Sequence, residues 1–291
     1  MKPASIVVRG ATAFVATFFI RAICGIFIHI NMKPAPHFFE WSLLTVALTA
    51  ATLTVLAARA DWRGWKLGTA VVVIPLAIQA VNTIEGIVFL TDVQLPWGRI
   101  FLLTLLSSLL MIPVWTLLFG RRDPVAEHFH PIASKSRGAR LWRFVVCDFS
   151  YILLYIIAGM IIFPYVKAFY ATQHLPSPET IIALQLLIRG PVFVVLCLLI
   201  TRMLGLPRIT SALAVGAIFT LLSGVAPLLT PNTIFPDSVR WVHFGEVTIS
   251  NFVFAALVAW LWGQEKQASG ARHQASGADL GLRTSDLGHH A

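Results

Sequence analysis

Eight apolar runs, each near the roughly 20 residues that a membrane helix needs, follow one another along this chain of 291 residues. A helix of that length crosses a hydrocarbon core of about 30 Å and satisfies its own backbone hydrogen bonds. The alternation typical of a β-barrel is absent. The sequence therefore predicts an all-α polytopic membrane protein with eight transmembrane helices. The predicted spans are 10–30, 41–58, 67–91, 100–119, 144–166, 181–203, 209–230 and 242–262.

The composition excludes several other classes of protein. Apolar residues make up 57% of the chain and charged residues only 12%, against about 25% charged in ordinary soluble proteins. A disordered chain, a disulfide-framed secreted domain and a separate soluble catalytic domain are therefore excluded. The three cysteines show no C-x-x-C spacing, and neither of the common nucleotide-binding motifs occurs. Any function must lie in the membrane or at its two faces.

The basic residues are distributed unequally between the two sides. If the spans alternate in direction, sixteen of the 22 Lys and Arg residues fall on one side, four fall on the other, and Arg21 and Arg189 lie inside spans. This asymmetry predicts that both termini are cytoplasmic and that the protein sits in a plasma membrane of the bacterial inner type. The net charge of +9 then reflects topology and attraction to anionic membrane lipids, and we expect no nucleic-acid partner.

A basic segment divides the spans into four plus four. The predicted parts are a first four-helix half (1–120), a basic cytoplasmic connector (121–143), a second four-helix half (144–263) and a disordered cytoplasmic tail (264–291). A weak self-match aligns Arg59–Gly120 with Arg202–Gly263 at a shift of 143 residues, which favours an internal repeat. Because each half has an even number of helices, the copies would be related by an axis along the membrane normal.

Polar side chains form stripes inside four of the predicted spans. An ionisable residue at the centre of a membrane helix costs about 2.5–3.5 kcal/mol on insertion scales, so such residues usually face the bundle interior and pair. Two arginines and two glutamates suit two buried ion pairs. We predict a charged cavity in the outer half of the membrane. The candidate substrate-binding or proton-coupling residues are Arg21, Gln79, Asn82, Glu85, Arg189, Glu246 and Asn251.

Backbone breakers lie close to these polar residues. Arg189 is followed directly by Gly190 and Pro191, and Pro227 falls in the next span. Interrupted helices near polar residues are typical of transporter binding sites. The sequence thus predicts a break in the sixth helix beside Arg189.

Three functions are compatible with this pattern. The first is a transporter or lipid-handling permease for an unidentified small molecule or lipid, with Glu85 exchanging protons and no cofactor. The second is an intramembrane metal-dependent hydrolase or transferase at the outer leaflet, which would hold zinc or another divalent metal; its ligands would be His29, Glu85, His243 and Glu246. The third is a non-catalytic membrane subunit, in which the charges serve only as structural pairs. The sequence leaves open whether the protein is an enzyme and which oligomer it forms.

Overall fold

The computed structural model describes residues 3–29, 36–89, 95–120, 136–231 and 235–263. Across these ranges the chain is helical, without strands, and eight helical spans are long and apolar enough to cross a membrane. The predicted all-α fold with eight transmembrane helices is confirmed. The predicted tail and most of the connector lie outside the described residues.

Six of the spans are single helices and two are composite. The single helices are α1 (Pro3–Ile28), α2 (Phe38–Arg59), α3 (Gly64–Phe89), α4 (Trp97–Phe119), α5 (Arg137–Tyr170) and α10 (Asp237–Trp262). The sixth span consists of α6 (Pro178–Leu184), the π-helical turn η1 (Gln185–Arg189) and α7 (Gly190–Leu204). The seventh consists of α8 (Arg208–Thr220), the π-helical turn η2 (Leu221–Val225) and α9 (Ala226–Leu229).

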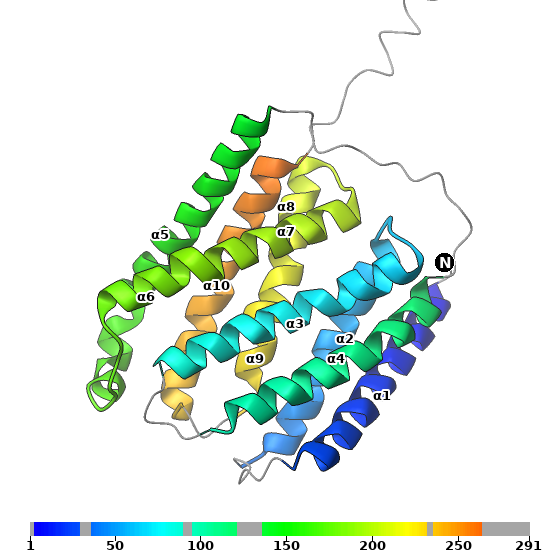
Figure 1. Ribbon diagram of the computed structural model, residues 1–291, viewed down its shortest axis with the longest axis horizontal. Coiled ribbons are helices and arrows are strands. Elements are labelled where there is room, and N and C mark those ends of the chain that lie inside the picture. Colours follow the sequence, from blue (N-terminus) through cyan, green and yellow to red (C-terminus); the bar gives the residue numbers. More distant parts are fainter. Residues whose placement is uncertain (1–2, 30–35, 90–94, 121–135, 232–234, 264–291) are drawn as a thin grey trace, which may run out of the picture.

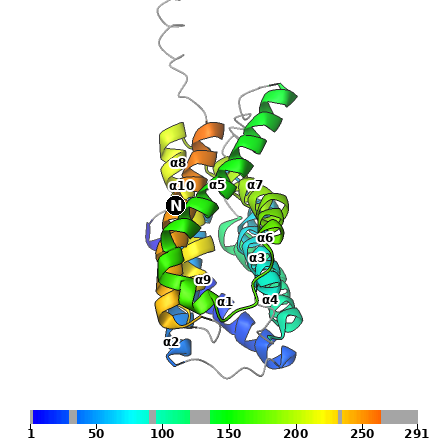
Figure 2. The same cartoon turned by 90° about the vertical axis from the view of Figure 1, so that its left-hand side faces the viewer.

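Helix neighbours follow a similar order in the first half and in the second. In the first, α1 contacts α2 and α4, and α3 contacts α4; in the second, α5 contacts α7 and α10, and α8 contacts α10. Between the halves, α2 and α3 contact the two composite spans. Two views show α3, α4, α6 and α7 in one layer and α2, α8, α9 and α10 in another (Figures 1 and 2). The division into two halves stays a prediction, which these neighbours support.

The fifth helix begins earlier than the apolar run suggests. It begins at Arg137, where the Ser136 hydroxyl accepts a hydrogen bond from the Ala139 amide at 3.3 Å and so caps the first turn. Its 34 residues are about 50 Å long, well beyond the hydrocarbon thickness. The first turns of α5 extend past the neighbouring helices (Figure 1). The helix therefore extends beyond the predicted span 144–166, because a helix outside the membrane needs no apolar side chains.

The predicted break beside Arg189 is instead a continuous helix with a π-helical turn. In η1 the Gly190 amide donates to the Gln185 carbonyl, and in η2 the Ala226 amide donates to the Leu221 carbonyl. The two donors, Gly190 and Ala226, each directly precede a proline. Proline has no amide hydrogen, and its ring crowds the preceding turn of an α-helix. The wider turn makes room for that ring. The breakers therefore widen these helices without interrupting them.

Close packing of α3 on α4 depends on a residue without a side chain. A Cβ atom at Gly68 would lie 2.8 Å from the Ile112 carbonyl oxygen and 3.1 Å from the Thr116 amide nitrogen. Both are backbone atoms, which cannot rotate away as a side chain could. Small residues permit this kind of approach between membrane helices.

We expect Gly68→Ala to lower the free energy of unfolding by about 1–3 kcal/mol, the usual effect of overpacking. Gly25→Ala is the matched control, because a Cβ there meets no atom within 4 Å. Both substitutions add the same helix propensity, so the difference isolates the packing. Thermal unfolding in detergent, followed by size-exclusion chromatography, measures it. Equal melting temperatures for the two variants would contradict this packing.

Candidate functional site

A cavity of about 1050 Å³ lies between the two layers of helices. Side chains from all eight spans line it, and most of them are apolar. All seven residues predicted as substrate-binding or proton-coupling candidates lie in its wall: Arg21, Gln79, Asn82, Glu85, Arg189, Glu246 and Asn251. The stripes identified in the sequence therefore converge on one space.

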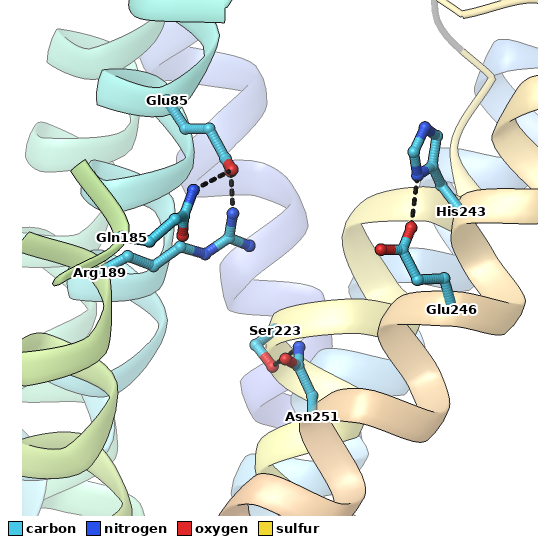
Figure 3. Close-up of polar contacts among 7 residues, drawn as sticks. All are labelled: Glu85, Gln185, Arg189, Ser223, His243, Glu246 and Asn251. Atoms are coloured by element: carbon cyan, nitrogen blue, oxygen red, sulfur yellow. Dashed lines mark hydrogen bonds and ion pairs between the residues drawn. The ribbon is translucent and has the colours of Figure 1, made fainter. Parts of the chain in front are cut away.

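An ion pair joins α3 to the sixth span at the wall of this cavity. The Arg189 guanidinium donates from Nη1 to Glu85 Oε2, and Gln185 Nε2 donates to Glu85 Oε1 at 3.2 Å (Figure 3). Glu85 lies on α3, whereas both donors lie on η1. The Glu85 side chain is 22% exposed, so the carboxylate also faces the cavity. Both carboxylate oxygens thus have a donor from η1.

The π-helical turn determines how these donors are presented. Gln185 and Arg189 are its first and last residues, and both are buried. The Arg189 guanidinium also lies 5.1 Å from the centre of the Phe193 ring, a cation-π contact one turn further along. Neither Gln185 Oε1 nor Arg189 Nε has a hydrogen-bond partner among the residues that the structure describes. Buried polar atoms usually have partners, so these two are exceptions within the described part of the chain.

A second polar chain lies on the opposite side of the cavity. His243 Nδ1 is 2.7 Å from Glu246 Oε2, and His243 Nε2 is 2.8 Å from Tyr170 Oη. With Glu246 ionised, Nδ1–H donates to the carboxylate and Nε2 accepts the Tyr170 hydroxyl hydrogen. Phe235 packs against the imidazole at 5.6 Å between ring centres. Every polar atom of this imidazole therefore has a partner.

The structure corrects the predicted pairing of two arginines with two glutamates. Only Arg189 pairs with a glutamate; Glu246 bonds His243, which is one turn away on the same helix. Arg21 lines the cavity wall from α1, and no acceptor within the described ranges lies in hydrogen-bonding distance of it. The Gln79 and Asn82 side chains likewise bond no described residue.

Asn251 lies deeper, where its Nδ2 donates to Ser223 Oγ at 2.8 Å. Ser223 belongs to η2, so each π-helical turn carries a polar contact to a neighbouring helix. Both side chains are buried, and both line the cavity (Figure 3).

Sequence reasoning missed Tyr170 and Ser223. Tyr170 ends α5, where an aromatic residue usually indicates only the membrane interface. Ser223 precedes a glycine and resembles an ordinary small packing residue. The one signal for it is Pro227 four residues later, which accompanies the wider turn.

Asp148 lies eleven residues inside α5 and is buried against Gly190. Its carboxylate approaches where Gly190 has no side chain, and Oδ1 has no hydrogen-bond partner among the described residues. It does not line the cavity.

The four residues of the metal alternative do not form one group. His29 follows the end of α1 with φ of 50° and lies outside the cavity wall, while Glu85 bonds Arg189 and Gln185. Within the described part of the chain, no three His, Cys, Asp or Glu side chains are placed to hold a metal ion.

Fold and site together define the class: a multi-pass membrane protein with a largely apolar cavity that holds paired charges. Comparison with known proteins finds no family model, no curated protein and no solved structure that matches the chain.

We expect Arg189→Ala to lower the free energy of unfolding by about 3 kcal/mol, because it leaves the Glu85 carboxylate without its cation in a site of low dielectric. The partial exposure of Glu85 places this loss at the lower end for buried pairs. The double variant Glu85→Ala/Arg189→Ala should be more stable than Arg189→Ala alone. Denaturation in mixed micelles measures the free energy of unfolding of wild type, the two single variants and the double variant, which together form a double-mutant cycle. Additive losses would contradict a direct pair.

The metal alternative predicts near-stoichiometric zinc or another divalent ion in the purified protein, lost in the double variant His243→Ala/Glu246→Ala. From the geometry we expect metal well below one ion per chain and no change in the variant. Elemental mass spectrometry of detergent-purified protein measures this. Stoichiometric metal in wild type that is lost in the variant would favour the metal-dependent hydrolase or transferase.

Proposed function

We propose that this chain is a transporter or lipid-handling permease in which Glu85 exchanges protons with the cavity. The observation that carries the proposal is the position of the Glu85–Arg189 pair. It lines the cavity and also joins α3 of the first half to η1 of the second. A change in the charge of Glu85 therefore acts on the ligand space and on the contact between halves at once.

Protonation gives this pair two states. When Glu85 is ionised, it holds Arg189 and Gln185 across the interface between the halves. When Glu85 takes up a proton, Arg189 loses its anionic partner in a medium of low dielectric, where an unpaired charge is costly. Its planar guanidinium is then free to bind a carboxylate or phosphate. Proton uptake and anion binding are thereby coupled.

Two further contacts join the halves near opposite ends of the bundle. The Asp61 amide, after α2, donates to the Met203 carbonyl near the end of α7 at 2.8 Å. The hydroxyls of Thr45 on α2 and Thr230 after α9 lie 2.9 Å apart. In alternating access one of these contacts opens while the other stays closed. The π-helical turn between them in the sixth span is a common feature of functional helices.

The proposed orientation places the cavity towards the outer face and both termini in the cytoplasm. Glu85 is four residues from the end of α3, and Glu246 is nine residues from the start of α10. The opposite ends of the spans carry the basic residues, as the positive-inside rule requires of a cytoplasmic face. Those described near the helix ends are Arg59, Arg63, Lys66, Arg137, Arg140, Arg143, Arg202 and Arg208.

We expect Glu85→Gln to fold and to bind ligand but to lose proton coupling, because the amide keeps the shape and cannot exchange a proton. Proteoliposomes loaded with a pH-sensitive dye, challenged with a panel of anionic solutes and lipids, report proton movement. Wild type should show ligand-dependent acidification or alkalinisation, and Glu85→Gln should show about one tenth of it or less.

Glu40→Gln is the matched control, because Glu40 lies in the first turn of α2 as an exposed side chain outside the cavity wall. It should keep the proton flux of wild type. Equal flux in all three proteins would remove Glu85 from the coupling role. Absence of ligand-dependent flux in wild type over the whole panel would favour the non-catalytic subunit.

A further inference from the structure

Arg21 differs from the other arginines that lie within or close to the membrane. Arg189 bonds Glu85, and Arg240 is buried with bonds to Asp237 and to the carbonyls that end α9. Arg9 donates to the Leu118 carbonyl. Each of these cations thus has an acceptor within the protein. Arg21 is exposed, lines the cavity and has none among the described residues.

The position of Arg21 on α1 aims it at the cavity. Thr17, Phe18, Arg21 and Ala22 all line the cavity wall, and their spacing puts them on one face of the helix. Arg21 is seven residues from the end of α1, about 10 Å below it. A guanidinium at that depth without a partner is costly, so an acceptor from outside the chain would stabilise it.

The wall beside Arg21 is apolar and reaches the outer surface of the bundle. Phe18 packs edge-on against Phe39 at 6.3 Å between ring centres. Phe38, Phe39 and Leu43 of α2 line the cavity and are also exposed. Exposed apolar side chains on membrane-spanning helices meet lipid, so this side of the cavity borders on the hydrocarbon region.

The other charges of the cavity wall are already engaged. Glu85 holds Arg189, and Glu246 holds His243 on α10. Counted with neutral histidine, the wall is formally neutral, but its free positive charge is at Arg21. The Arg21 guanidinium, its depth below the end of α1 and the apolar wall beside it together match a molecule with one acidic group and a hydrocarbon chain.

We propose that the cavity binds an anionic amphiphile, with its phosphate or carboxylate group on Arg21 and its hydrocarbon chain along Phe18, Phe39 and Leu43. A guanidinium forms bidentate, charge-assisted hydrogen bonds with either acidic group. This inference rests on the proposed transport or lipid-handling role, for which it supplies the substrate class.

Native mass spectrometry of the full chain in detergent tests the proposal. The probes are dioleoyl phosphatidic acid, oleate, dioleoyl phosphatidylcholine and inorganic phosphate. We expect one phosphatidic acid or one oleate to bind, whichever head group the site prefers, at least about tenfold more tightly than phosphatidylcholine. Arg21→Gln should weaken that binding about tenfold or more, and Arg21→Lys should weaken it less.

Arg59→Gln is the matched control, because it removes the same charge from an exposed end of α2 outside the cavity wall. Equal weakening by Arg21→Gln and Arg59→Gln would overturn the proposal in favour of non-specific surface binding. If inorganic phosphate bound as tightly as phosphatidic acid, the inference that the ligand needs a hydrocarbon chain would be wrong. Binding needs no transport, so Arg21-dependent binding without proton flux would count against the transport role alone and leave this site in place.

Discussion

Hydrocarbon offers no hydrogen-bond partner, and this constraint shapes most polar features of the protein. The backbone meets it by remaining helical through all eight spans, even where prolines remove amide donors. The side chains meet it by pairing: Glu85 with Arg189, Glu246 with His243, and Asn251 with Ser223. Because these partners come mostly from different helices, the requirement for pairing also specifies which helices face one another around the cavity.

In the proposed function, the paired groups combine structural and functional roles. In water an exchange of partners by Arg189 would change the free energy little, since solvent screens the charges. In the proposed function, the same exchange in the cavity wall would alter both the contact between α3 and η1 and the charge that a ligand meets. In that proposal, a few polar residues have a large effect on the free energy of the contact between helices. The apolar wall around them contributes because it keeps the dielectric low.

The sequence predicts best those features that depend on the residue's own chemistry. Apolar runs identify the eight spans, and any ionisable or amide side chain within them is driven to the interior, which is why Glu85, Gln79 and Asn82 could be placed at the cavity. The hydrogen-bond partner of each polar side chain is harder to predict. Glu246 could reach Arg21 only if their helices were adjacent, whereas His243 lies one turn away from Glu246 on the same helix. His29 lies just after the end of α1 and outside the cavity wall, and Tyr170 was missed because a tyrosine at a helix end has a common alternative role.

The two π-helical turns have a consequence for the rotational register of their helices. A π-helical turn holds one residue more than an α-helix uses for the same stretch, and one residue corresponds to a rotation of about 100°. The helix on the α6 side of η1 is thus turned by that angle relative to α7. Loss of a single residue from η1 would leave hydropathy and helix length almost unchanged, yet α6 would present a different face to its neighbours. The number of residues in this turn matters as much as their identity.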